Sequence, residues 1–224
     1  MADGQTIPGC GLSLVVLRNL PLFSGLEQAE LEKLGQVAVR RRATRGEFIV
    51  RAGEITDSLF ILVSGSAKVT NCDEDGREII LAILGPSEFF GEMGLIDGSP
   101  RSANVVAQQN CELLVMTRAD FHRCMQDNFQ VALKLMRILV QRLREADRKI
   151  ESLALLDVYG RVARLLLEMS VVENGRRVVT RKISKQDMAR MIGASREMVS
   201  KVMRDLENSG YVCHEGDLMV IVEA

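Results

Sequence analysis

The stretch that decides the fold is Phe90-Gly91-Glu92-Met93-Gly94-Leu95-Ile96-Asp97-Gly98-Ser99-Pro100-Arg101-Ser102-Ala103. A glycine-rich turn that leads into a short helix points several backbone N–H groups at one place, which is typical of a phosphate site. Arg101 adds a planar fork of two donors that matches a phosphate. The carboxylate of Glu92 would repel a phosphate unless it faces a hydroxyl, such as the 2′-OH of a ribose. The stretch therefore predicts a nucleotide site.

Length and composition indicate two modest domains in a chain of 224 residues, of which 47% are hydrophobic. Basic and acidic residues nearly cancel, at 29 and 30, so any nucleic-acid surface has to be local. The scattered histidines and cysteines, without a C-x-x-C pair, predict no metal site. An odd set of cysteines fits a reducing cytoplasm, in which thiols act as small apolar fillers. These residues are Cys10, Cys72, Cys111, Cys124, Cys213, His122 and His214.

The apolar segment Leu12–Leu17 is too short for an export signal or a membrane span. We therefore expect a soluble protein of the cytoplasm that does not contact a membrane. Residues 12–37 have apolar positions three and four apart, which predicts short helices.

Between Arg40 and Met116 the pattern changes to short apolar segments that are separated by glycine-bearing turns. Regularly spaced short strands of this kind fold as an antiparallel barrel or jelly roll, so the chain as a whole belongs to the α+β class. The predicted strands are 48–50, 59–63, 67–69, 79–84, 104–107 and 112–116.

Nothing breaks a helix between Phe129 and Leu156. One apolar stripe steps by four and three residues in turn, which predicts a coiled-coil seam and hence a parallel homodimer. The alternative is a core helix of a monomer, but the charged residues around the stripe leave it narrow and favour the seam. Leu133, Leu135 and Ile138 lie on another side and are expected to pack on the barrel. The seam comprises Ala132, Met136, Leu139, Leu143, Ala146, Ile150 and Leu153.

Two short helices joined by Ile192-Gly193-Ala194 are predicted to form a helix-turn-helix. Ser184 caps the first helix and Ser195 caps the second, which ends at Asn208. The segment 176–204 contains nine basic and two acidic residues, a local charge of +7, whereas the net charge of the whole chain is −1. This concentration favours a surface for DNA phosphates over a merely solvated face.

The sequence on either side of this pair predicts further elements. A helix over 161–171 and a loop at Asn174-Gly175 are expected before it. After it, two apolar segments flank Glu215-Gly216-Asp217 as a hairpin, which makes the unit a winged helix-turn-helix.

Three motifs in this order resemble the CRP/FNR family of bacterial transcription regulators, from about Leu12 to the end of the chain. They are the run F-G-E-x-x-L with R-S-A after a spacer, the long helix, and S-R-E-M-V at 195–199. The resemblance implies a cyclic-nucleotide-binding β-roll over 12–128, a dimerisation helix over 129–156 and a winged helix-turn-helix over 157–224. It also implies a cyclic nucleotide effector, with double-stranded DNA, a second copy of the chain and RNA polymerase as partners.

The resemblance also implies roles for individual residues. Arg101 would pair with the cyclic phosphate, and Glu92 would accept a hydrogen bond from the ribose 2′-OH. Arg196 would pair with guanine, and Glu197 would accept from cytosine N4. The residues assigned to the nucleotide are Gly91, Glu92, Met93, Arg101, Ser102, Ala103, Ala146 and Asp147. The residues assigned to DNA are Ser184, Lys185, Ser195, Arg196, Glu197, Ser200 and Lys201.

Ala146-Asp147 departs from the family pattern, in which members that bind cAMP offer threonine and serine hydroxyls to the adenine. We expect cAMP as the effector, but the Asp147 carboxylate could accept from a guanine, which leaves cGMP and cyclic di-GMP open. A regulator that needs no ligand is a further alternative. Cys10 stands alone, which speaks against an iron–sulfur cluster. No catalytic constellation is present, so no enzyme is expected.

Overall fold

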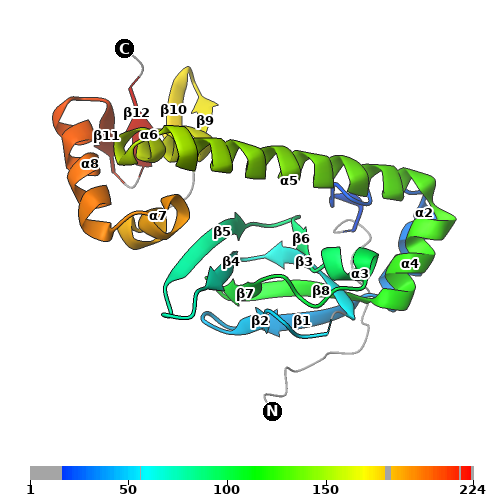
Figure 1. The fold of residues 1–224 in the computed structure, drawn as a ribbon. Helices are drawn as coiled ribbons and strands as arrows, with labels where there is room; N and C mark the ends of the chain where they lie inside the picture. The colour runs from blue at the N-terminus through cyan, green and yellow to red at the C-terminus, as the bar shows by residue number, and fades with distance from the viewer. Residues whose placement is uncertain (1–16, 56, 180–182, 217, 223–224) are drawn as a thin grey trace. The chain divides into compact units, whose positions relative to one another are not determined.

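The computed structural model of the chain describes residues 17–55, 57–179, 183–216 and 218–222 (Figure 1). The chain divides into two compact units, residues 1–141 and 142–224, and helix α5, Phe129–Leu155, belongs partly to each. The family-based boundaries at 128 and 156 stay a prediction. Several residues named in the sequence analysis lie outside the described ones: Cys10, the segment 12–16, Arg181, Lys182 and Asp217.

The first unit is a roll of two four-stranded antiparallel sheets, which confirms the predicted jelly roll and the α+β class. One sheet has the order β1-β8-β3-β6 and the other has the order β2-β7-β4-β5. The strands are β1 Val39–Ala43, β2 Phe48–Val50, β3 Ser58–Ser64, β4 Ala67–Cys72, β5 Glu78–Leu84, β6 Phe89–Phe90, β7 Asn104–Ala107 and β8 Cys111–Thr117.

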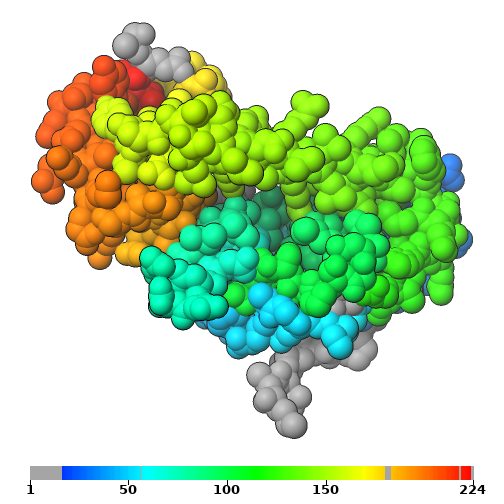
Figure 2. Space-filling view, in the orientation of Figure 1, coloured from blue at the N-terminus to red at the C-terminus, as the bar shows by residue number. Residues whose placement is uncertain are grey.

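Strand β3 explains why the sequence of this sheet has continuous apolar runs. Phe60 and Leu62 point into the roll, whereas Leu59 and Ile61 point to a second core. A strand that is buried on both faces shows no polar alternation. The second core includes residues of helices α2, Gln28–Val37, and α4, Arg118–Asp127. Figure 2 shows the visible face of the roll, coloured cyan to green, closed by side chains.

Two strands of the roll were not predicted. Strand β1 has the sequence Val-Arg-Arg-Arg-Ala, and its arginines conceal the pattern of a half-buried strand. Arg41 can be partly buried on this strand because its guanidinium pairs with Glu47 at 3.1 Å and lies 5.8 Å from the ring of Phe60. Strand β6 has only two residues, too few for a periodic signal.

Three helices pack around the core of the second unit, and a sheet with the order β11-β12-β10-β9 accompanies them. The helices are α6 Val158–Glu168, α7 Lys185–Ile192 and α8 Arg196–Asn208, and the strands are β9 Ser170–Glu173, β10 Arg176–Val179, β11 Val212–Glu215 and β12 Leu218–Ile221. The antiparallel pair β11–β12 confirms the predicted wing hairpin.

The predicted helix and the predicted turn at Asn174-Gly175 are both present, but the helix bounds of 161–171 were wrong and the two strands around the turn were not predicted. Helix α6 begins after Asp157, whose side chain accepts from the N–H of Gly160 at 2.8 Å, and it ends at Glu168. The next residues form the hairpin β9–β10. Its turn consists of Asn174 and Gly175, with φ of +51° and +77°, the angles that a tight hairpin turn needs. Asn174-Gly175 between two valine-containing segments was the sequence signal that could have predicted this hairpin.

The described cysteines correct the prediction that all thiols act as apolar fillers. Cys111 is buried and Cys124 is half-buried, and burial raises the pKa of the Cys124 thiol to about 11. Cys72 and Cys213 are exposed instead. Within the described residues, no group of three or more His, Cys, Asp or Glu could hold a metal ion. Of the described helices, none is long and apolar enough to cross a bilayer.

Candidate functional site

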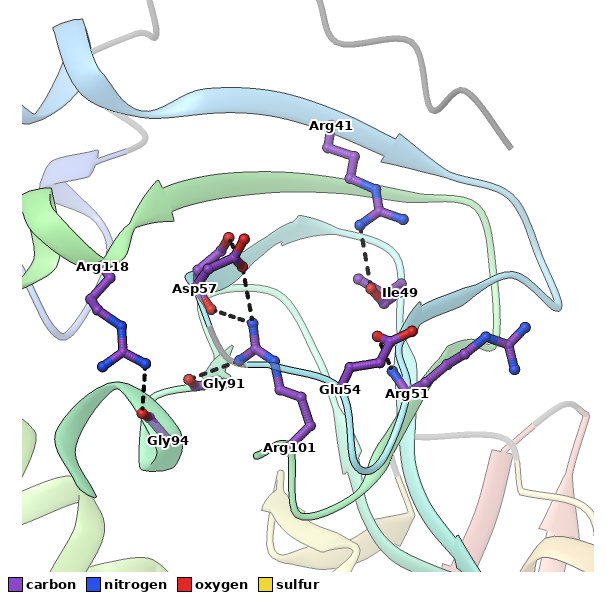
Figure 3. A network of polar contacts seen from close by, with 10 residues as sticks. Arg41, Ile49, Arg51, Glu54, Asp57, Gly91, Gly94, Arg101 and Arg118 are labelled. Carbon is purple, nitrogen blue, oxygen red and sulfur yellow. Dashed lines mark hydrogen bonds and ion pairs between the residues drawn. The ribbon is translucent and has the colours of Figure 1, made fainter. Parts of the chain in front are cut away.

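Arg101 is the centre of the predicted nucleotide site, and two backbone carbonyls hold its guanidinium (Figure 3). Nη1 donates to the carbonyl of Gly91 at 2.9 Å, and Nη2 donates to the carbonyl of Ser58 at 2.7 Å. The backbone N–H of Arg101 donates to the carbonyl of Glu54 at 2.9 Å. These bonds fix both the main chain and the tip of the side chain, so the guanidinium has a defined position.

The charge of Arg101 is buried, since the residue is only 8% exposed. Burial lowers the pKa of the guanidinium because the charged form loses hydration, while the nearby carboxylates of Asp57, Glu54 and Glu92 raise it. Asp57 Oδ1 lies 4.0 Å from Nη2, and its side chain is largely exposed to solvent. A buried cation of this kind suits an incoming phosphate, because charge-assisted hydrogen bonds offset the lost hydration.

Gly91 is required where the Arg101 guanidinium passes the chain. Its φ is +88°, and a Cβ atom there would collide with Arg101 Nη1 and lie 3.1 Å from the Ser58 carbonyl oxygen. Both the positive φ and the close approach therefore demand glycine. We call the Gly91 and Ser58 carbonyls and the space left by Gly91 the cradle of Arg101. The cradle suits a guanidinium that must stay in place to receive a phosphate.

Glu92 precedes the five-residue helix α3, Met93–Asp97, and is only 3% exposed. Its carbonyl accepts the N–H groups of Leu95 and Ile96 at 3.0 and 3.1 Å, which begins the helix. A buried carboxylate is suited to a hydroxyl donor and not to a second anion. Its place beside the guanidinium is consistent with the predicted contact to a ribose hydroxyl.

The remaining cassette residues lie in the same loop system. The hydroxyl of Ser102 lies 3.8 Å from the sulfur of Met93, and both residues are exposed, whereas Ala103 is buried. Asn71 was not predicted to belong here, but its Nδ2 donates to the carbonyl of Ser102 at 3.2 Å. The sequence carried no signal for Asn71, because its contact depends on the pairing of β4 with β7.

Helix α5 carries the predicted seam. Met136, Leu143, Ile150 and Leu153 are 48%, 61%, 65% and 55% exposed, which leaves an apolar stripe on the helix. Leu139 differs, because it packs partly against the core of its own unit, together with Leu135 and Ile138. Ala146 and Asp147 are both exposed on the part of α5 that belongs to the second unit. Their roles toward a nucleotide stay a prediction.

Helices α7 and α8 form the predicted helix-turn-helix. The hydroxyl of Ser184 accepts from the N–H of Asp187, and that of Ser195 accepts from the N–H of Met198 at 3.2 Å. Gly193 ends α7 in the left-handed region with φ of +63°. Arg161 of α6 was not predicted to contribute, but its Nη1 donates to the carbonyl of Ile192 at 2.8 Å. A cation there complements the C-terminal end of the α7 dipole.

The two faces of α8 differ in the way that a DNA-reading helix requires. Val199, Val202, Met203 and Leu206 are buried against the rest of the unit. Arg196, Glu197 and Lys201 are exposed, as are Ser184, Lys185 and Ser195, while Ser200 is half-buried. The predicted DNA-binding residues thus lie on the solvent side of the pair, where a major groove could receive them.

The carboxylate of Glu197 takes part in the start of α8. Hydrogen bonds from its own backbone N–H and from the Ser195 hydroxyl lower its pKa, and the neighbouring Arg196 charge adds to this effect. The group expected to read cytosine therefore lies in the first turn of α8, where its charged form is favoured.

The chain matches two family models, a cyclic nucleotide-binding domain over residues 40–128 and a Crp-like helix-turn-helix domain over 160–223. It is 38% identical over 201 residues to the cAMP-activated global transcriptional regulator Vfr of Pseudomonas aeruginosa, covering 85% of this chain and 92% of that relative. It is 30% identical over 213 residues to a CRP-like cAMP-activated global transcriptional regulator of Mycobacterium tuberculosis, covering 93% of this chain and 95% of that relative.

A solved structure supports the same fold. The chain is similar to the c-di-GMP responsive global regulator CLP of Xanthomonas campestris, with a TM-score of 0.73 and 27% identity. The match covers 88% of this chain and 100% of that structure.

Gly91→Ala is expected to displace the Arg101 guanidinium, because the added Cβ would occupy the position of Nη1. Binding of a cyclic nucleotide, measured as the rise in thermal midpoint at saturating ligand, should then be lost. Gly98→Ala is the matched control, since Gly98 also has a positive φ of +78° but no heavy atom lies within 4 Å of its added Cβ. Equal responses of the two variants would contradict the cradle.

Ser195→Ala is expected to lower the free energy of unfolding of the second unit by about 1 kcal/mol through loss of the helix cap. The pKa of Glu197 should rise toward its ordinary value, because one of its hydrogen bonds is lost. A carboxyl with a lowered pKa adds stability above its ordinary pKa and loses it as the pH falls through the lowered value.

An NMR titration of the Glu197 carboxyl carbon measures this shift. Ser209→Ala, at the opposite end of α8, should leave the Glu197 pKa unchanged.

Proposed function

This chain belongs to the CRP/FNR family of transcription regulators, and from that premise we propose that it binds cAMP at Arg101 and reads a two-fold symmetric DNA site as a homodimer. The observation that carries the proposal is the buried Arg101 guanidinium, held at 2.9 and 2.7 Å by the carbonyls of Gly91 and Ser58. Its position allows it to pair with the cyclic phosphate, while Glu92 accepts from the ribose 2′-OH and Ser102 adds a hydroxyl.

The choice of cAMP rests on relatives. The two regulators that match at 38% and 30% identity are both described as cAMP-activated. Cyclic di-GMP is the second candidate, because the structurally similar CLP is c-di-GMP responsive and the exposed Asp147 carboxylate could accept from a guanine. cGMP would use the same acceptor.

The homodimer is supported by the apolar stripe of α5, which is exposed in the single chain and follows the spacing of a two-stranded coiled coil. Two copies of α8 would then meet two half-sites of a palindrome. A ligand would change DNA binding only if it had different affinities for two arrangements of the dimer, one that binds DNA well and one that binds it poorly. RNA polymerase as a partner and a place in the cytoplasm follow from the proposed action on promoters, and no catalytic role is proposed.

Arg101→Leu is expected to abolish the response to nucleotide, since it removes the phosphate-binding cation. The measurement is fluorescence anisotropy of a symmetric duplex, selected from a random pool, with cAMP, cGMP or cyclic di-GMP added. Arg51→Leu, an exposed arginine near the same loop, is the control and should respond as the wild type does. A wild type whose DNA affinity is indifferent to all three compounds would favour a ligand-independent regulator.

Arg196→Ala is expected to cost about 1–3 kcal/mol of discrimination between the selected site and a variant with its guanine replaced. Nucleotide binding should remain intact, as calorimetry can check. Lys185→Ala is the contrast. Loss of a phosphate contact should weaken binding to all DNA sequences alike and reduce the salt dependence of the DNA affinity. An equal loss of affinity on every sequence for Arg196→Ala would refute its role as a base reader.

A further inference from the structure

The cradle of Arg101 has two walls that are far apart in the sequence but come from the paired strands β3 and β6. One wall is the start of β3, where Ser58 offers its carbonyl, and the other is the turn before α3, where Gly91 offers its own. The guanidinium can bind both carbonyls only while the two walls keep a fixed separation. The pairing of β3 with β6 holds the two strands together, but it ends at Phe90, so the Gly91 turn and α3 need contacts of their own to stay in place.

Arg118, the first residue of α4, is bonded to residues next to both walls. Its backbone N–H donates to the carbonyl of Asp57, the residue before Ser58, at 2.7 Å. Its guanidinium Nη2 donates to the carbonyl of Gly94 in α3 at 3.2 Å. Figure 3 shows Arg118 reaching α3 on the side away from Arg101, with Asp57 and Gly91 between them.

His122 adds a second bond to the same short helix. It lies four residues after Arg118, so the two side chains share one face of α4. Its Nε2 lies 2.8 Å from the carbonyl oxygen of Leu95 and must donate, since a carbonyl can only accept. Two successive carbonyls of α3 are thus bound to α4, and α3 begins two residues after Gly91.

Arg118 is also close enough to act electrically on the site. Its charge lowers the pKa of the Arg101 guanidinium, because two cations near each other disfavour the charged form. A phosphate bound at Arg101 would relieve this repulsion. Arg118 therefore has two ways to affect an anion at Arg101, by fixing α3 with the Gly91 turn and by its charge.

We propose that Arg118, assisted by His122, is a positioning residue of the nucleotide site that fixes α3, and with it the Gly91 turn before α3, so that Arg101 can receive the cyclic phosphate. The inference rests on the proposed nucleotide binding at Arg101. Arg118 itself does not contact the nucleotide. When the Arg118 side chain is shortened, α3 loses a hydrogen bond to α4, and the guanidinium of Arg101 loses its defined position.

The test compares Arg118→Met and Arg118→Lys by calorimetric titration of the full-length protein with cAMP, cGMP and cyclic di-GMP, using whichever binds the wild type. Arg118→Met removes the hydrogen bond and should raise Kd about tenfold, the effect of one charge-assisted bond. Arg118→Lys keeps the charge and a donor and should stay within about threefold of the wild type. The thermal midpoint without nucleotide should differ little among the three proteins.

Salt separates positioning from charge. If Arg118 positions the Gly91 turn, the ratio of the Kd values of Arg118→Met and wild type should persist from about 0.1 M to about 0.5 M salt, where long-range charge effects are screened. A ratio that falls to one at high salt would show that only the charge acts, and the proposal would be wrong. An unchanged Kd in Arg118→Met would equally overturn it.

His122→Ala serves if Arg118→Met does not fold, because the His122 side chain is exposed and its loss leaves the core intact. It should raise Kd severalfold, whereas Arg123→Ala, which removes a neighbouring side chain that faces Asp120, should not. Equal Kd values for these two variants would count against the proposal. A wild type that binds none of the three nucleotides would refute the proposed function itself, which separates the two failures.

Discussion

The candidate nucleotide site of the first unit depends on the placement of one buried cation. Removing a guanidinium from water is costly unless hydrogen bonds replace the lost hydration, and Arg101 obtains two of them from backbone carbonyls. Carbonyls carry only partial charge, so the site retains a preference for an anion. The pairing of β3 with β6 brings the Ser58 and Gly91 carbonyls close enough for this, and the passage of the guanidinium explains why Gly91 has no side chain.

The elements after the cassette form a continuous path from this cation to the long helix. Helix α4 is bonded to α3 through Arg118 and His122, and it ends at Asp127, directly before Asn128. The carbonyl of Asn128 accepts from Val131 and Ala132 at the start of α5, and its side chain donates to Glu30 of α2. A shift of α3 would therefore reach α5 through the side chains of Arg118 and His122 and then through the hydrogen-bonded main chain of α4, where the ligand favours one of two arrangements.

The parts of the molecule that sequence could predict are those encoded locally. The cassette is one run of residues, and the helix-turn-helix is marked by Ser184, Gly193 and Ser195 at fixed spacings. Arg118 could not be found in this way, because its role follows from the antiparallel register that sets Ser58 opposite Thr117. Strand β1 was missed for another reason. Its Arg41 is stabilised by an ion pair and a ring contact, and no sequence periodicity reveals such contacts.

The uneven environments of the four described thiols give the protein two chemical handles. Cys72 on β4 and Cys213 on β11 are exposed and lie in different units, whereas Cys111 is buried and Cys124 stays protonated near neutral pH because of its pKa of about 11. Maleimide reagents attack thiolates, so they would select the two exposed positions. Once Cys10 is replaced, a fluorophore on each would report by energy transfer how the spacing of the two units responds to an effector.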